Sequence, residues 1–149
     1  MKNFESILVA IDFSDSSDNA FQAALMMAKQ HSARLLILHI INEPVDLRGF
    51  YVPHISFDKL EEEIEEGAKK LMETFCRQHI KEFDNYETFI APGVPYEAII
   101  TKATDEGAEL IVIGTHGRTG LDHVLFGSTA EKVVRKSPLP VLSVRLDEE

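Results

Sequence analysis

Five short, largely apolar segments alternate with longer helical patterns, and this alternation constrains the fold most strongly. The apolar segments span residues 7–11, 35–41, 86–90, 110–113 and 141–145. Strands that are apolar on both faces are typical of a parallel sheet, because the connecting helices cover both of its faces. The pattern therefore predicts an α/β fold, with a five-stranded parallel sheet sandwiched between helices.

The segments between these strands carry helix signals at their ends. Residues 12–18 contain several N-cap candidates ahead of the first helical pattern. A long helix is expected to begin at Asp58, with Glu61 completing a capping box. The third helix is expected to stop at Gly107, a predicted C′ residue. The last helix starts near Ser128.

The length and the net charge of the chain limit the classes of function that it can have. The 149 residues suit one domain, 1–149, with a substantial core. Lys and Arg number 15 against 25 Asp and Glu, a net charge of −10, whereas nucleic-acid binding relies on clustered cations. No apolar run approaches the roughly 20 residues that span a bilayer, and no signal-peptide pattern opens the chain. The single cysteine, Cys76, fits a reducing cytoplasm and a packing role on a helix. We expect a cytoplasmic protein without nucleic-acid or membrane partners.

A glycine-rich segment follows the fourth predicted strand. Gly114, Gly117 and Gly127, followed by Ser128, have the spacing G-x2-G-x9-G-S. Glycine lets the backbone approach an anion closely, and a new helix N-terminus offers unpaired N–H groups. Neither G-x-x-x-x-G-K-[ST] nor G-x-G-x-x-G occurs. The segment indicates the phosphate loop of a nucleotide site, although a ligand-free turn that needs positive φ uses the same residue type.

This spacing resembles the ATP-binding branch of the universal stress protein family. The resemblance extends over nearly the whole chain, through Asp12 after the first strand, residues 39–41 (HII) and the tail 137–144 (SPLPVLSV). It implies a Rossmann-like fold of the adenine nucleotide alpha hydrolase-like type, with strand order 3-2-1-4-5. Ligands bind such sheets where the strand order reverses, here between strands one and four. Asp12 and the glycine loop would then face each other across one crevice.

The resemblance also implies the nucleoside contacts. The Asp12 carboxylate would accept hydrogen bonds from ribose hydroxyls, and the backbone of Ile40 would meet the adenine edge. Ala10, Ile11 and Ile113 would line the base pocket. For Asp12 the alternative is capping of the following helix. The neighbouring His39, in a buried strand, is expected to be a core residue with satisfied polar atoms.

The phosphate end of the predicted site uses the loop and the start of the last helix. Ser128 has two interpretations, a capping-box hydroxyl bonded to the Glu131 N–H or, with Thr129, a source of phosphate-binding amides. Arg118 can reach the outer phosphates or be an exposed loop residue. His116 suggests acid–base chemistry, but no partner carboxylate is evident. The remaining phosphate candidates are Gly114, Gly117 and Gly127.

These features predict a cytoplasmic, ATP-binding regulatory protein of the stress response. ATP, ADP or AMP is the expected ligand, with Mg²⁺, and we assign no catalytic or metal-ligating residue. A slow ATPase or phosphotransferase at the same site, or a structural stress protein without nucleotide, are the alternatives. The missing Walker lysine and paired acidic metal motif favour a binding module.

The last predicted strand, 141–145, lies at an edge of the expected sheet. Edge strands expose unpaired N–H and C=O groups that must be protected or paired. The family resemblance implies a homodimer formed through this strand. A monomer whose edge is guarded by charged residues 145–149 is the alternative.

Overall fold

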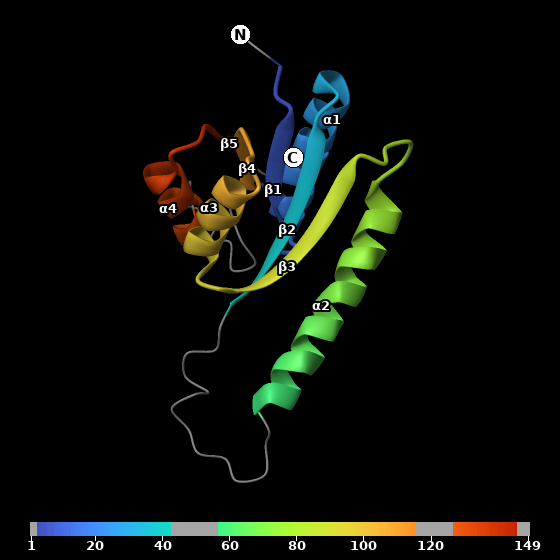
Figure 1. Ribbon diagram of the computed structural model, residues 1–149, viewed down its shortest axis with the longest axis vertical. Helices are drawn as coiled ribbons and strands as arrows, with labels where there is room; N and C mark the ends of the chain where they lie inside the picture. Colours follow the sequence, from blue (N-terminus) through green and yellow to red (C-terminus); the bar gives the residue numbers. More distant parts are fainter. Residues whose placement is uncertain (1–2, 43–56, 116–126, 146–149) are drawn as a thin grey trace.

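A parallel sheet forms the centre of the molecule in the computed structural model, which describes residues 3–42, 57–115 and 127–145 (Figure 1). The strand order is β3-β2-β1-β4-β5, and every neighbouring pair is parallel. The predicted α/β class and strand order are therefore confirmed. The strands are β1 (Ser6–Ala10), β2 (Arg34–Asn42), β3 (Tyr86–Gly93), β4 (Leu110–Gly114) and β5 (Val141–Val144).

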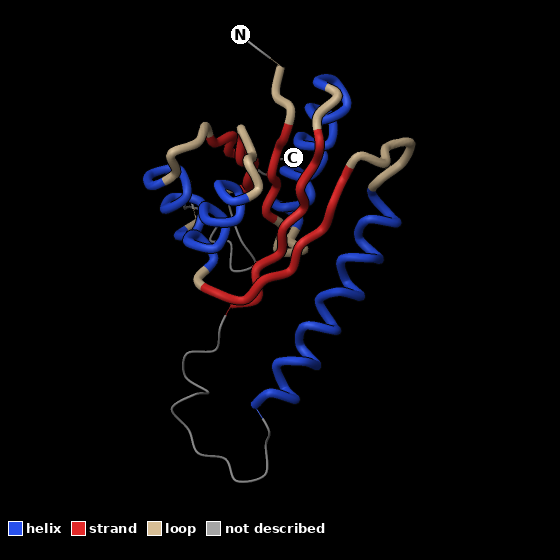
Figure 2. The backbone as a smooth tube through the Cα atoms, viewed as in Figure 1, coloured by secondary structure: helices blue, strands red, loops and turns tan. Residues whose placement is uncertain are grey.

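Helices flank the sheet on both faces (Figure 2). In the described residues they are α1 (Asp15–His31), α2 (Phe57–His79), α3 (Pro95–Asp105) and α4 (Ser128–Lys136). Because α2 begins at Phe57, Asp58 lies within the helix, and its predicted capping role is wrong. Gly107 follows the C-cap residue Glu106 with φ +71°, so its predicted C′ role is confirmed.

Two apolar clusters hold the layers together, one on each face of the sheet. Successive strand residues point to opposite faces. Ile7 and Val9 therefore pack with α1 and α2, while Leu8 and Ala10 pack with α3 and α4. Phe21 of α1 is the largest fully buried side chain among the described residues. Strands buried on both faces explain the uniformly apolar runs in the sequence.

Helix α2 packs on the sheet through only part of its length (Figure 1). Its side chains Ile64 and Leu71 are 39% and 51% exposed. Cys76 of this helix is buried in the core, and burial raises the pKa of its thiol to about 11, which fits the expected packing role. The residues of α2 that are buried against the sheet are Ala68, Met72, Phe75 and Cys76.

No described helix is both long enough and apolar enough to cross a membrane.

Candidate functional site

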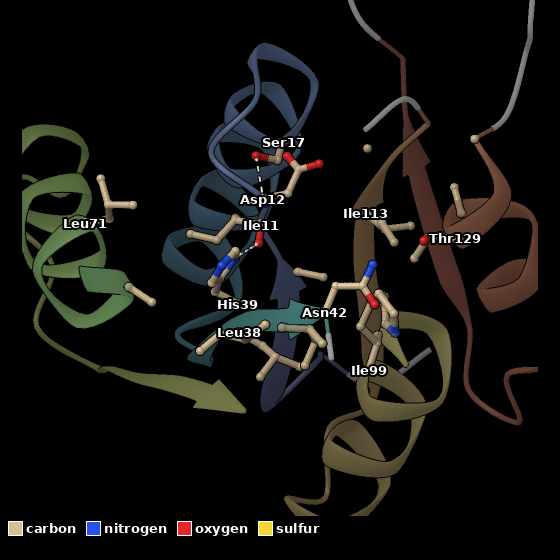
Figure 3. Close-up of a pocket in the computed structure, with 18 of the residues that line it drawn as sticks. Ile11, Asp12, Ser17, Leu38, His39, Asn42, Leu71, Ile99, Ile113 and Thr129 are labelled. Carbon is tan, nitrogen blue, oxygen red and sulfur yellow. Dashed lines mark hydrogen bonds between the residues drawn. The ribbon is translucent and has the colours of Figure 1, made fainter. Parts of the chain in front are cut away.

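A cavity of about 860 Å³ opens at the carboxyl ends of β1, β2 and β4 (Figure 3). This is the point where the strand order reverses, between β1 and β4. Helices α2, α3 and α4 complete the walls. The predicted site residues that line the cavity are Ala10, Ile11, Asp12, Ile40, Ile113, Gly114, Gly127, Ser128 and Thr129. The other three predicted residues, His116, Gly117 and Arg118, lie outside the described residues.

Asp12 lies in the turn between β1 and α1, half-buried at the cavity wall. Its backbone N–H donates to Ser17 Oγ at 3.2 Å, and its Oδ1 accepts the Ser14 N–H at 3.0 Å. The N-cap of α1 is Ser14, whose side chain accepts the Ser17 N–H. The capping alternative for Asp12 is therefore wrong, because Ser14, two residues later, is the N-cap and the helix begins at Asp15. The carboxylate instead braces the turn and lines the cavity.

His39 also lines the cavity, which the sequence interpretation missed. Its Nδ1 lies 2.9 Å from the Ile11 carbonyl oxygen (Figure 3). A carbonyl only accepts hydrogen bonds, so Nδ1 carries the hydrogen and donates it. The ring also packs on Phe13, with 4.7 Å between centroids. Phe13 has φ +66°, a left-handed conformation uncommon for a residue of this size. The available signal was the place of His39 beside Ile40, at a strand end facing the crevice.

Gly114 ends β4 in close contact with the first turn of α1. A Cβ atom at this position would lie 2.5 Å from Ser16 Oγ and 2.8 Å from Ser16 O. Ser16 is buried, so the neighbouring backbone cannot easily move away. Gly114 is therefore required for packing whether or not a ligand is bound. This packing brings the start of α1 and the end of β4 to the same side of the cavity.

Thr115 and Gly127, the described residues on either side of the glycine-rich segment, are hydrogen-bonded to each other. The Gly127 N–H donates to the carbonyl oxygen of Thr115, and the Thr115 N–H donates to Val144 O at 3.1 Å. The N-cap of α4 is Gly127, and Glu131 N–H bonds Gly127 O at 3.0 Å, with no side-chain cap. The predicted Ser128 capping box is therefore wrong, because Ser128 is already the first helical residue. The first turn of α4, which has N–H groups without intrahelical acceptors, borders the cavity.

The cavity thus combines three chemical features. A carboxylate on the β1–α1 turn accepts hydrogen bonds from hydroxyl groups, and the start of α4 attracts anions. Apolar side chains from both sides of the sheet form the remaining walls, as is usual in small-molecule sites. In the part of the chain that the structure describes, no cluster of His, Cys, Asp or Glu is arranged to hold a metal ion. This set suits a ligand that joins an apolar ring, hydroxyls and an anionic group.

Comparison with known proteins agrees with the resemblance found in the sequence. A family model described as the universal stress protein family matches residues 3–145. The universal stress protein YxiE of Bacillus subtilis is 37% identical over 147 residues, which cover 95% of this chain and 99% of that protein. The universal stress protein MJ0577 of Methanocaldococcus jannaschii is 30% identical over 154 residues, which cover 95% of each.

Solved structures share the architecture. The structure of MJ0577 superposes with a TM-score of 0.84 at 29% identity, covering 99% of both chains. A universal stress protein in complex with cAMP has a TM-score of 0.64 at 22% identity, covering 98% of this chain and all of that one. One from Archaeoglobus fulgidus in complex with dAMP has a TM-score of 0.66 at 21% identity, covering 95% and 98%. From the match of the family model over nearly its whole length, the chain belongs to the universal stress protein family.

Proposed function

We propose that the chain binds an adenine nucleotide in the cavity between the ends of β1 and β4 and acts as a regulatory binding protein. The proposal rests on one observation. The Asp12 carboxylate, Gly114 and the first turn of α4 all line the same cavity, which lies where the strand order reverses. Nucleotides offer the complementary ribose hydroxyls and phosphates. The cAMP and dAMP complexes of two proteins with this fold support the ligand class.

In this proposal the adenine lies on the face of the sheet that α3 and α4 cover. Ala10, Ile113 and Ile99 contribute apolar walls there, and Ile40 adjoins the same cluster. The ribose lies near Asp12. The phosphates lie near Gly127 and the backbone amides that begin α4, where the helix dipole favours negative charge.

The phosphate contacts extend into the loop that follows Thr115. His116, Gly117 and Arg118 stay predictions, and Mg²⁺ is proposed as a companion of ATP. Arg118 supplies the positive charge that outer phosphates would require. We propose that nucleotide occupancy acts as a signal in the stress response, in keeping with the family of the chain. Binding is favoured over catalysis because neither a Walker lysine nor a paired acidic metal motif occurs in the sequence.

Calorimetry of nucleotide-stripped protein with ATP, ADP and AMP, with and without Mg²⁺, tests the proposal. We expect micromolar binding by the parent and at least a tenfold loss in Asp12→Asn and Gly127→Trp. Asp105→Asn, on an exposed residue at the end of α3, is the matched control and should bind like the parent. Absence of binding by the parent would contradict the proposal. Single-turnover hydrolysis at about 1 s⁻¹ or faster would instead indicate an enzyme.

We further propose that β5 pairs with its own copy in a homodimer. It is the outermost strand on its side of the sheet, and Leu142 is 37% exposed. An open edge presents backbone donors and acceptors that a second strand can satisfy. The light-scattering experiment in the Discussion tests this pairing.

A further inference from the structure

The cavity continues beyond the proposed nucleotide site toward α2. We call this part the α2 lobe, formed by Ile64, Gly67 and Leu71 of α2 with His39 and Ile41 of β2. In Figure 3, Leu71 lies on one side of the cavity and Thr129 of α4 on the opposite side, with Asp12 and His39 between them. The α2 lobe therefore adjoins the proposed ribose position at Asp12 and lies away from the proposed phosphate position.

The α2 lobe exposes large apolar side chains. Ile64 and Leu71 are 39% and 51% exposed, although both line the cavity. On the face of the same helix that packs on the sheet, Met72 and Phe75 are only 2% and 6% exposed. Apolar side chains that line a cavity without being covered are typical of a site for an apolar ligand group.

A glycine widens the lobe at the centre of this helix wall. A Cβ atom on Gly67 would meet nothing within 4 Å. Neither close packing nor a positive φ therefore requires glycine there, although glycine inside a helix costs roughly 0.5–1 kcal/mol relative to alanine. Its place between Ile64 and Leu71 leaves a notch in an otherwise apolar wall. A notch of this kind accommodates part of a ligand.

The floor of the lobe carries one polar atom suited to a ligand. Because Nδ1 of His39 bonds to Ile11 O, Nε2 is the ring nitrogen left to meet a ligand, and it accepts a hydrogen bond in the tautomer whose hydrogen is on Nδ1. Within the described ranges, Nε2 makes no hydrogen bond to protein. A donor at the junction of base, ribose and lobe would satisfy it. A substituted adenine amine keeps one N–H, and ribose keeps a hydroxyl.

We propose that the α2 lobe binds an apolar group carried on the nucleoside end of the nucleotide. The ligand class is an adenine nucleotide with an alkyl group on the exocyclic amine or an acyl group on the ribose. The argument rests on the proposed nucleotide site, because it is the bound nucleoside that directs the apolar group toward α2. The continuity of one cavity from Asp12 to Leu71 carries the assignment.

Titration of the full chain with AMP, N6-hexyl-AMP and 2′(3′)-O-hexanoyl-AMP tests this inference. At least one derivative should bind tenfold or more tightly than AMP, and the tighter one identifies the point of attachment. When the alkyl or acyl chain of the tighter derivative is lengthened, each added methylene should raise the affinity by up to about fourfold, the equivalent of about 0.8 kcal/mol per buried methylene.

Variants separate the lobe from the nucleotide site. Leu71→Gln should abolish the gain from the hexyl group while leaving AMP affinity unchanged. Met26→Gln, which alters a 55% exposed side chain of α1 outside the cavity, should change neither. Gly67→Phe fills the notch and should act like Leu71→Gln, with circular dichroism verifying the helix in each variant.

Two results would overturn the inference. If neither derivative binds more tightly than AMP, or if the gain survives both α2 variants, the lobe does not bind the apolar group and the nucleotide proposal stands. If AMP and both derivatives fail to bind, the proposed function and this inference both fall.

Discussion

At the scale of single residues, Gly114 and Gly67 differ in what surrounds them. We expect Gly114→Ala to lower the free energy of unfolding by about 1–3 kcal/mol, because the new methyl group would overlap Ser16. Gly67→Ala should raise it by roughly 0.5–1 kcal/mol, since its surroundings are open and alanine favours a helix. Urea denaturation of both variants measures the difference. An unchanged midpoint in Gly114→Ala would contradict the close approach of β4 and α1.

Asp12 and His39 mark the limits of sequence reasoning at this scale. The place of Asp12 at a strand end, with a family resemblance, was enough to predict that it lies at the crevice. The apolar strand around His39 predicts a core position for its ring. Its place beside Ile40 at a strand end was a signal for the cavity, but its hydrogen bond and ring contact depend on Ile11 and Phe13, which lie in a separate segment of the chain.

At the scale of elements, the first turns of α1 and α4 are capped differently. Ser14→Ala should lower the free energy of unfolding by about 1 kcal/mol, because the Ser14 side chain accepts an N–H of the first turn. Ser128→Ala should change it by less than about 0.5 kcal/mol, because Gly127 occupies the N-cap position. Chemical denaturation compares the two. A loss of 1 kcal/mol in Ser128→Ala would restore the capping box.

Strand positions were predicted well because burial on both faces leaves continuous apolar runs. The largest difference is at β3, which continues through Pro92 to Gly93, beyond the expected end at Ile90. An edge strand tolerates a proline whose nitrogen faces outward, because the outer side of the strand needs no N–H donor. The starts of helices were predicted less accurately, because a shift of one residue changes which side chain caps the helix.

At the scale of the whole molecule, both sheet edges are open within the described residues, and we expect β5 to form the dimer. Light scattering should give twice the 16.7 kDa of one chain. Leu142→Lys should shift the mass to that of the monomer, because a charge on an edge strand opposes pairing. Met26→Lys, on an exposed residue of α1, is the matched control. A monomeric parent would contradict the dimer.

The hydrogen bond from Gly127 to Thr115 has a consequence for how this protein can diversify. It fastens both ends of an eleven-residue stretch, 116–126, to the same edge of the core. Extending such a closed stretch costs little, since doubling its length adds only about 0.6 kcal/mol of closure entropy. We therefore expect insertions between Thr115 and Gly127 to leave the stability of the sheet and its helices nearly unchanged, so that differences in length can accumulate at this point of the chain.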